Sequence, residues 1–358
     1  ARPGPVVLHV LTRKGRGYGP AERDEDRCLH DVGRFDVESG APVRMTSSAR
    51  SYTETFGAAM LDVASRHDDV VAITAAMGSP TGLRAFAEKH PDRYFDVGIA
   101  EQHAVNVAAG MAMGGLRPVV AIYSTFLNRA WDQLYYDVGL HQLPIVLCLD
   151  RAGVTGDDGP SHHGVLDLML LAKVPGMTVL APSSAEELTT MLHHALDHVR
   201  GPVALRWPKS PAPSSDAVGH GLRARRIREG GAVCLIGVGK LVAACDAAAD
   251  LLGDAGVGAT VWDARSVVPI DEHLLADAAT HDLVVTVEDG IVDGGFGARV
   301  RDSLVLSGSS RVVTCGVPTA YLPHGEATAL LSSLGLDAAG IARTVLASLE
   351  GPRDAGRV

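Results

Sequence analysis

Lysine is scarce in this sequence, and paired cysteines and long apolar runs are missing from it. Only five of the 358 residues are lysine, and no basic tract offsets the formal net charge of -10, which argues against nucleic-acid binding and leaves anion binding to arginine. The five cysteines show neither a CxxC motif nor a paired spacing, as is typical of free thiols in a reducing cytoplasm. No apolar run approaches the roughly 20 residues of a membrane span and no secretory leader is recognisable, so we expect a cytoplasmic protein without a membrane partner.

The rest of the composition, with 46% hydrophobic and 21% charged residues, is typical of a soluble globular protein of about two domains. Residues 5–12 (PVVLHVLT) predict one short buried strand. Because a parallel strand needs a neighbour, we expect it to be the last strand of a domain whose remainder lies outside this sequence. The opening Ala-Arg-Pro, in place of Met, agrees with a fragment or processed piece. Residues 13–50, rich in glycine, proline and charge, predict loop and linker.

Two series of buried strands alternate with helical patterns after this segment, and they predict an α/β fold of two successive doubly wound parallel-sheet domains. A Pro/Ser-rich linker at 209–220 separates the two series. The second series closes with a helix near 338–349. The expected strands are 69–74, 94–98, 117–123, 144–150, 177–181 and 202–206 in the first series, and 232–237, 257–263, 283–288 and 311–315 in the second.

Polar and aromatic side chains follow the predicted strand ends of the first sheet. In open parallel sheets, ligands bind beyond the carboxyl ends of the strands, so these residues are candidates for a site. The candidates are Glu101, Tyr123, Phe126, Arg129, Arg151, the loop GVTGDDGPSHHG with Asp158 and His162, and Arg206.

Each candidate also has a structural interpretation. Glu101 in the first turn of an apolar helix could simply complement the helix dipole, although its burial predicts a specific partner. Phe126 could be a core aromatic, and the arginines could be surface charges. The Asp and His pairs of the 157–163 loop do not favour a metal site, because consecutive residues project in different directions and no third cluster supplies ligands. We therefore interpret this segment as a mobile loop whose His and Asp side chains meet a substrate.

Several phrases together resemble the 1-deoxy-D-xylulose-5-phosphate synthases of the thiamine-diphosphate-dependent transketolase superfamily. The phrases are SYTETFG, PDRYFDVGIAEQHAVNVAAG, VAIYSTFLNRAWDQL, LPIVLCLDRAGVTGDDGPSHHG and RWP. The resemblance implies the tail of a diphosphate-binding domain plus linker at 1–49, a pyrimidine-binding domain at 50–215 and a C-terminal domain at 225–358. The family's GDG…N element, which holds Mg²⁺ and the diphosphate, does not occur in this sequence, so those ligands are expected in an N-terminal domain or fragment that acts as a partner.

The resemblance also implies roles in cofactor binding. Glu101 would hydrogen-bond N1′ of the aminopyrimidine of thiamine diphosphate and so favour the tautomer that serves as a base. Phe126 would stack on the pyrimidine, and Arg129 would belong to the same wall of the site.

Substrate roles follow in the same way. Tyr123, Arg151 and Arg206 would bind the phosphate of the acceptor sugar, a role that suits the planar guanidinium fork. Asp158 and His162 would orient substrate during proton transfers. No role beyond shaping the dimer or the pocket is implied for Glu288 or His324.

The implied reaction decarboxylates pyruvate and transfers the two-carbon unit to D-glyceraldehyde 3-phosphate, the first step of the non-mevalonate isoprenoid pathway. The chain is expected to be inactive without the N-terminal domain and to form a homodimer. Two alternatives remain open: a β-type subunit of a split transketolase or 2-oxoacid dehydrogenase, and a non-catalytic remnant that acts as a binding module.

Overall fold

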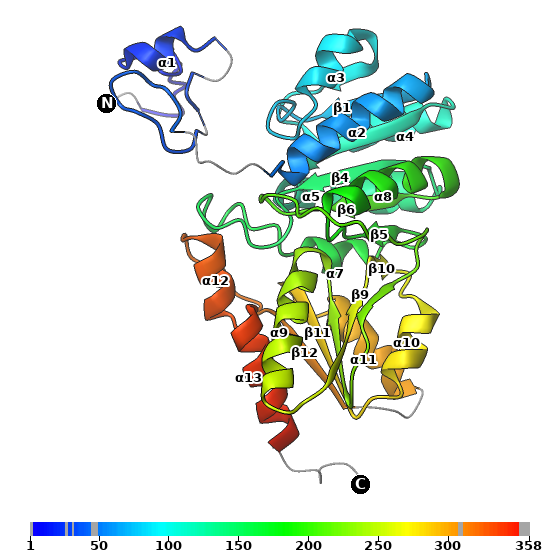
Figure 1. Ribbon diagram of the computed structural model, residues 1–358. Helices are drawn as coiled ribbons and strands as arrows, with labels where there is room; N and C mark the ends of the chain where they lie inside the picture. The colour runs from blue at the N-terminus through cyan, green and yellow to red at the C-terminus, as the bar shows by residue number, and fades with distance from the viewer. Residues whose placement is uncertain (1–2, 26–27, 31, 44–48, 307–310, 351–358) are drawn as a thin grey trace. The chain divides into compact units, whose positions relative to one another are not determined.

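The computed structural model describes residues 3–25, 28–30, 32–43, 49–306 and 311–350 (Figure 1). The chain divides into two compact units, residues 1–48 and 49–358, and each is described by itself.

The first unit is mostly turns around the short helix α1 (Gly19–Arg23). The prediction of a buried strand at 5–12 is wrong for this chain: the segment forms no strand, and Val7 and Leu8 are 96% and 83% exposed. A strand needs a neighbour to satisfy its backbone N–H and C=O groups, and no described residue of this unit pairs with the segment in a ladder.

The second unit contains two α/β sheets, and the predicted fold class is confirmed. In the first sheet the strand order is β10-β5-β6-β4-β3-β1-β2, and every pair except β10–β5 is parallel. Its strands are β1 (Val70–Thr74), β2 (Tyr94–Asp96), β3 (Arg117–Tyr123), β4 (Val146–Asp150), β5 (Thr178–Leu180), β6 (Val203–Arg206) and β10 (Ser266–Val268).

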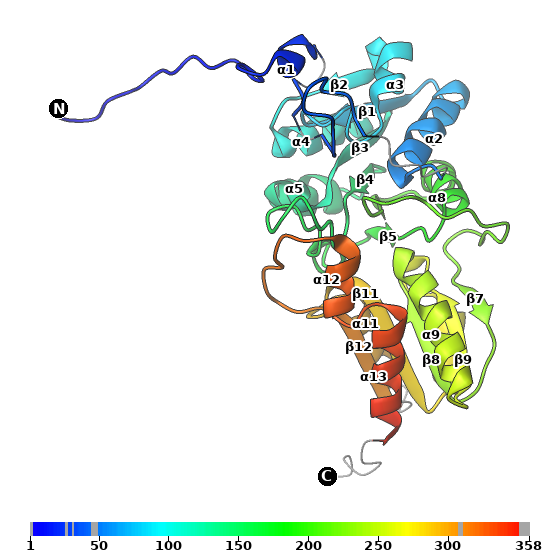
Figure 2. The ribbon, with the colours of Figure 1, turned by 60° about the vertical axis from the view of Figure 1, so that its left-hand side comes forward.

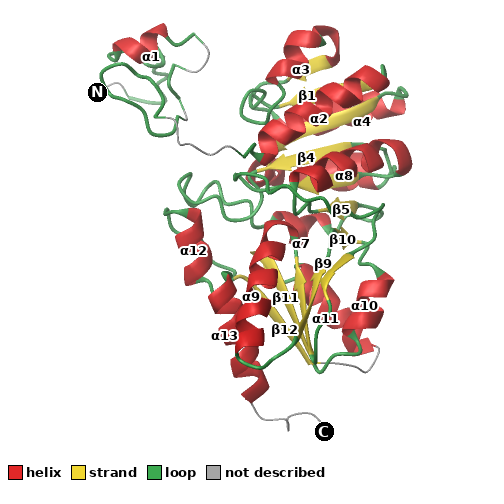
Figure 3. Ribbon diagram, in the orientation of Figure 1, coloured by secondary structure: helices red, strands yellow, loops and turns green. Residues whose placement is uncertain are grey.

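The second sheet has the order β12-β11-β8-β9-β7, with β7 antiparallel to β9 at the edge. Its strands are β7 (Arg225–Arg228), β8 (Val233–Gly237), β9 (Ala259–Asp263), β11 (Leu283–Ile291) and β12 (Arg311–Val317). The short antiparallel strands β7 and β10 were not among the predicted strands. Strand β10 comes from the second half of the chain but pairs with β5 of the first sheet, so the two halves share a sheet (Figure 3).

Helices cover both faces of each sheet, and the alternation of side chains along the strands divides the core between them. In the first sheet, Val70 and Ala72 pack with α2, α3 and α8, whereas Ile73 packs with α4 on the opposite face. In the second sheet, α9 and α13 cover one face, and α10 and α11 cover the other. The longer helices are α2 (Tyr52–Arg66), α3 (Arg84–Lys89), α4 (Glu101–Met113), α8 (Ala185–His198), α9 (Val242–Asp254), α10 (Glu272–Ala278), α11 (Phe296–Leu306), α12 (Ala327–Ser333) and α13 (Ala338–Glu350).

Shorter helical pieces connect these elements: α5 (Ser124–Leu127), α6 (Trp131–Gln133), α7 (Asp167–Leu171), and the helices η1 (Pro91–Arg93), η2 (Asn128–Ala130), η3 (Leu134–Gly139) and η4 (Gly239–Leu241). Residues 327–350 are long and apolar enough to suit a membrane span by composition. They nevertheless form two helices, α12 and α13, and α13 packs along α9 (Figure 2).

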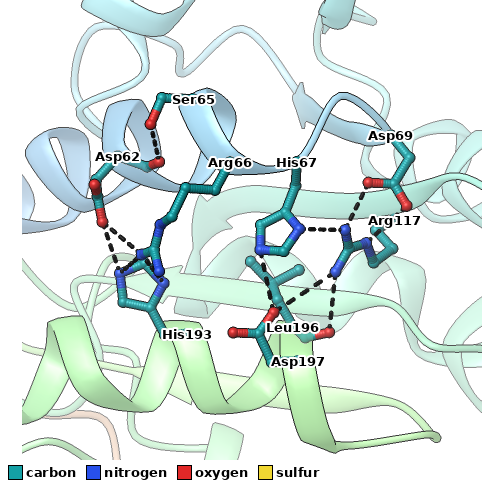
Figure 4. A network of polar contacts seen from close by, with 9 residues as sticks. All are labelled: Asp62, Ser65, Arg66, His67, Asp69, Arg117, His193, Leu196 and Asp197. Carbon is teal, nitrogen blue, oxygen red and sulfur yellow. Dashed lines mark hydrogen bonds and ion pairs between the residues drawn. The ribbon is translucent and has the colours of Figure 1, made fainter.

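A network of charged side chains ties helices α2 and α8 to the amino end of the first sheet (Figure 4). Arg117, the first residue of β3, makes a two-pronged contact with Asp69, with distances of 2.9 and 2.6 Å from Nε and Nη2. Its Nη2 also lies 2.6 Å from Nδ1 of His67, whose Nε2 faces Asp197 of α8 at 3.1 Å. This network fixes one end of the sheet and leaves the carboxyl end of the strands to build a site.

Candidate functional site

Glu101 is the first residue of α4, and its side chain is only 3% exposed. Arg129 Nη1 donates to Glu101 Oε1 at 2.9 Å, so the partner that burial predicted for this carboxylate is the guanidinium of Arg129. No side chain caps the amino end of α4, and the preceding residue Ala100 carries no polar group to do so. The acidic side chain therefore lies at the positive end of the helix dipole and also binds a cation.

Three aromatic rings and two guanidinium groups gather next to this carboxylate. Tyr123, at the end of β3, stacks on Phe126 with a centroid distance of 5.6 Å and an interplanar angle of 13°. His162 meets the same Phe126 ring edge-on at 5.4 Å. The guanidinium of Arg129 lies over Phe126 at 5.4 Å, and that of Arg151 lies over Tyr123 at 4.0 Å, both within cation–π range.

Arg151 is held in a backbone conformation that few non-glycine residues adopt. Its φ is +57°, its backbone N–H donates to Asp150 Oδ1 at 2.7 Å, and its Nη1 donates to the Pro80 carbonyl at 3.0 Å. Burial raises the pKa of Asp150, while the Arg151 charge and the Thr53 hydroxyl, 2.6 Å from Asp150 Oδ2, act in the opposite direction. Strained left-handed residues of this kind cluster at functional sites, which agrees with the position of Arg151 at a strand end.

Arg206 lies apart from this cluster. It ends β6, is 3% exposed, and donates from Nε to Asp167 Oδ2 at 2.9 Å and from Nη1 to Asp289 Oδ1 at 2.6 Å. Lys240 also faces Asp289, at 3.1 Å. The phosphate-binding role predicted for Arg206 stays a prediction. It would require Asp167 or Asp289 to release the guanidinium.

The loop between β4 and α7 carries the other predicted residues. Asp158 accepts from Lys209 Nζ at 2.9 and 3.0 Å, and His162 Nδ1 lies 2.9 Å from the hydroxyl of Ser161. The structure therefore brings His162 into the aromatic cluster through Phe126, whereas Asp158 points to a lysine beyond the end of β6.

Two residues of this region have contacts that the sequence did not predict. His163 is 7% exposed; its Nδ1 accepts from the backbone N–H of Thr155 at 3.1 Å, and its Nε2 lies 3.2 Å from the carbonyl of Pro323. This arrangement requires the tautomer with a proton on Nε2 and ties the loop to the segment before α12. Lys209 could have been found from its position, because it follows the end of β6 by three residues. The role of His163 had no sequence signal, since its partner lies 160 residues away.

The residues around Glu101 have the chemistry to hold the pyrimidine of the implied cofactor. A buried carboxylate next to a half-buried aromatic ring already holds one planar, nitrogen-bearing cation, the Arg129 guanidinium. An aminopyrimidine ring offers the same combination of a flat face and a hydrogen-bonding nitrogen. Among the residues that the structure describes, no group of three or more His, Cys, Asp and Glu side chains could hold a metal ion.

The class of protein follows from two matched domain families and from solved structures. Residues 48–214 match the pyrimidine-binding domain of transketolase, and residues 222–341 match the transketolase C-terminal domain. A split-gene transketolase, solved as an inactive β4 tetramer, is 30% identical with a TM-score of 0.76, covering 84% of this chain and 99% of its own. A mutant transketolase from Pichia stipitis has a TM-score of 0.71 at 14% identity over 85% of this chain and 46% of its own, and it supports the fold alone.

Curated relatives narrow the class. The 1-deoxy-D-xylulose-5-phosphate synthases of Mycobacteroides abscessus and Pelotomaculum thermopropionicum are 48% and 46% identical, over 96% and 97% of this chain. The chain belongs to the transketolase family, and the resemblance to the 1-deoxy-D-xylulose-5-phosphate synthases that its motifs predicted is confirmed. It spans about half the length of the curated relatives it matches, 54% and 55% of these two.

Proposed function

We propose that this chain supplies the pyrimidine-binding and C-terminal parts of a thiamine-diphosphate-dependent 1-deoxy-D-xylulose-5-phosphate synthase. The enzyme would decarboxylate pyruvate and transfer the two-carbon unit to D-glyceraldehyde 3-phosphate. The observation that carries the proposal is Glu101: a buried carboxylate at the start of α4 whose partner, Arg129, also lies over the ring of Phe126, in a chain similar to these synthases. We assign residues 1–49 to the tail of a diphosphate-binding domain plus linker, 50–215 to the pyrimidine-binding domain and 225–358 to the C-terminal domain.

Glu101 would hold a proton at N1′ of the aminopyrimidine. A charge-assisted hydrogen bond at this position contributes about 1.5–3 kcal/mol, and it fixes the tautomer of the ring. When bound, thiamine diphosphate supplies the electron sink that the decarboxylation needs. Phe126 would provide a stacking surface, and its contact with Tyr123 keeps the ring from turning away.

Arg151 and Tyr123 would bind the phosphate of the acceptor. The guanidinium of Arg151 is oriented by Asp150 and the Pro80 carbonyl, so little side-chain entropy remains to be lost when a phosphate binds. Arg206 would join them only if it exchanged Asp167 or Asp289 for the phosphate. Asp158 and His162 would orient the substrate from the loop, with His162 positioned by its contact with Phe126.

The test is Glu101→Ala in the complete enzyme, with Glu101→Gln as the variant of matched volume. General-base assistance of this kind contributes about 10²–10⁴ in rate, so we expect kcat to fall by at least a hundredfold in both variants. Circular dichroism should report an unchanged fold. Near-normal formation of 1-deoxy-D-xylulose 5-phosphate by either variant would exclude the proposed role of Glu101.

The finer expectations belong to the same proposal. They are Mg²⁺ and diphosphate ligands from an N-terminal domain or fragment, inactivity of this chain without that partner, a homodimer and a cytoplasmic location. The 1.5–3 kcal/mol expected from Glu101 and about 0.5–1.5 from stacking on Phe126 support a site of only millimolar affinity, which is why the partner would be needed.

A second candidate function is the β-type subunit of a split transketolase or 2-oxoacid dehydrogenase. It is favoured by the split-gene transketolase, which is 30% identical to this chain and is covered by it over 99% of its length. The acceptor separates the two: the synthase would transfer the unit from pyruvate to D-glyceraldehyde 3-phosphate, whereas the alternatives would transfer a two-carbon unit to another sugar or to a lipoyl group. A remnant with a binding role only would show no turnover with any of these acceptors in the reconstituted enzyme.

A further inference from the structure

Arg129 makes both of the contacts that the proposed cofactor ring would need. It donates to the buried carboxylate of Glu101 at 2.9 Å, and its guanidinium lies over the ring of Phe126 at 5.4 Å. The Arg129 side chain is 56% exposed while that of Glu101 is 3% exposed, so the guanidinium reaches the carboxylate from the solvent side.

We infer that Arg129 is a displaceable occupant of the aminopyrimidine site, which must leave Glu101 and Phe126 before the ring can bind. The inference rests on the proposed function. A guanidinium and an aminopyrimidine share a planar shape, N–H donors and an affinity for an aromatic face. They therefore compete for the same carboxylate and the same ring.

The energetic reason for an occupant lies in the burial of Glu101. A buried carboxylate without a partner is strongly disfavoured, so the chain without cofactor gains by pairing it with a side chain. Because the Arg129 end of the pair is largely exposed, solvent screens the interaction, and displacement costs only a modest factor in affinity. The interaction of Arg129 with Glu101 is thus strong enough for Arg129 to occupy the site without cofactor, and weak enough for the cofactor ring to displace it.

Displacement gives Arg129 a second position. Arg129 lies over Phe126, Phe126 stacks on Tyr123, and Arg151 lies over Tyr123, so we expect a guanidinium released from Glu101 to move toward Arg151. There it would add a positive charge to the proposed binding site for the anionic substrate. Ring binding would then raise the affinity for an anion, and by linkage an anion would raise the affinity for the ring.

The test measures thiamine binding to this 358-residue chain by nuclear magnetic resonance titration. Arg129→Ala removes the competitor and leaves Glu101 without a partner, so we expect thiamine to bind about five- to tenfold more tightly than to the wild type. Arg129→Lys keeps a charge that can pair with Glu101, and its affinity should lie between the two. Arg84→Ala removes an arginine that pairs with Glu88 at 3.0 Å on the surface of α3, and serves as the matched control with unchanged binding.

The outcomes separate this inference from the function on which it rests. Weaker or unchanged binding to Arg129→Ala, together with loss of binding in Glu101→Gln and Phe126→Ala, would overturn the occupant role and leave the cofactor site in place. If neither Glu101→Gln nor Phe126→Ala weakened thiamine binding, the proposed cofactor site itself would fail. Thermal denaturation of each variant checks that it is folded.

A second measurement follows the coupling. Saturating thiamine should increase the affinity of the wild-type chain for inorganic phosphate, and this increase should disappear in Arg129→Ala. An equal phosphate affinity with and without thiamine would contradict the second position of Arg129.

Discussion

Arg206 illustrates how one side chain can carry much of the stability of a region. Its guanidinium is buried between the carboxylates of Asp167 and Asp289, which raise its pKa against the effect of burial. In return, the positive charges of Arg206 and Lys240 hold the pKa of Asp289 below its usual value although burial acts to raise it. Because Asp167 begins α7 and Asp289 lies in β11, Arg206 connects the end of β6 to both.

Replacement of Arg206 by methionine should therefore be strongly destabilising. The change leaves two carboxylates buried without their main partner, a loss of about 3–5 kcal/mol in the free energy of unfolding. Urea denaturation measures it. The matched control, Arg84→Ala, breaks a surface pair and should cost no more than about 1 kcal/mol. A loss below that value in Arg206→Met would show that the buried pairs are not important for stability.

The position of Arg206 was predictable from the sequence, but its surroundings were not. A buried apolar run that ends in arginine locates the residue at the carboxyl end of a strand. Its partners lie 39 and 83 residues away, and their contact depends on how β6, α7 and β11 pack. Tyr123, Phe126 and Arg129 were easier to predict, because they lie within a stretch of seven residues that comprises the end of β3 and the short helices α5 and η2. Their stacking follows from local geometry.

The loop between β4 and α7 is held to the segment before α12 by one histidine side chain and one backbone contact. His163 joins the backbone of Thr155 to the carbonyl of Pro323, and the backbone N–H of Gly325 lies 3.4 Å from the carbonyl of Gly156. The segment before α12 thus holds the loop that carries Asp158 and His162.

His163→Ala should loosen this loop without unfolding the sheet. Loss of its two hydrogen bonds removes about 1–2 kcal/mol of local stability, which corresponds to roughly tenfold faster amide hydrogen exchange over residues 154–164. Mass spectrometry of the exchanged peptides measures the rate. His162→Ala is the neighbouring control: it removes the ring contact with Phe126 but no hydrogen bond to the segment before α12, so it should change exchange in the loop less than His163→Ala does. Equal protection in His163→Ala and the wild type would exclude the tether.

The start of α11 predicts a pH dependence of stability. Burial raises the pKa of Glu288 to about 7, although its carboxylate accepts from the backbone N–H groups of Phe296 and Gly297 at 2.9 and 2.8 Å. Because the pKa in the folded chain is above that in the unfolded chain, the folded state binds the proton more tightly. Its stabilising contribution is complete below about pH 4.5 and is lost as the pH rises through 7.

We expect its loss to lower the free energy of unfolding by about 3 kcal/mol between pH 5 and 8. Glu288→Gln does not titrate, so the stability of the wild type relative to the variant should fall as the pH increases over this range. Urea midpoints of both proteins at several pH values give the difference. A difference that stayed constant with pH would contradict the raised pKa.

At the scale of elements, sequence patterns were most informative where a strand is buried on both faces. Strands β1, β3, β4, β6, β8, β9 and β11 were predicted within a few residues because each is a continuous apolar run. The edge strands β7 and β10 were missed, since they are short, and their pairing depends on distant residues of β9 and β5. The segment 5–12 shows the opposite error: it has the composition of a buried strand but no partner among the described residues of its unit.

At the scale of the whole molecule, the shared sheet predicts how the chain responds to division. A protein of residues 49–220 would contain β5 without β10, and so would leave β5 as an open edge. Unpaired edge strands associate with one another, so we expect this piece to form dimers or larger aggregates at micromolar concentration. Light scattering after size-exclusion chromatography measures the mass. A stable monomer would show that β10 is not needed to cover the edge.

The pairing of β10 with β5 of the first sheet also has an evolutionary consequence. Fusion and fission of genes are simplest where a boundary in the sequence is also a boundary in space, and the segment 209–220 has the composition of such a joint. In this chain it is not one, because three residues from beyond it, Ser266–Val268, complete the sheet that precedes it. A division of the gene at that point would separate two halves of one hydrogen-bonded sheet, whereas a division before Ser51 would leave both sheets whole. The arrangement of the strands thus favours inheritance of the two α/β regions as a single piece.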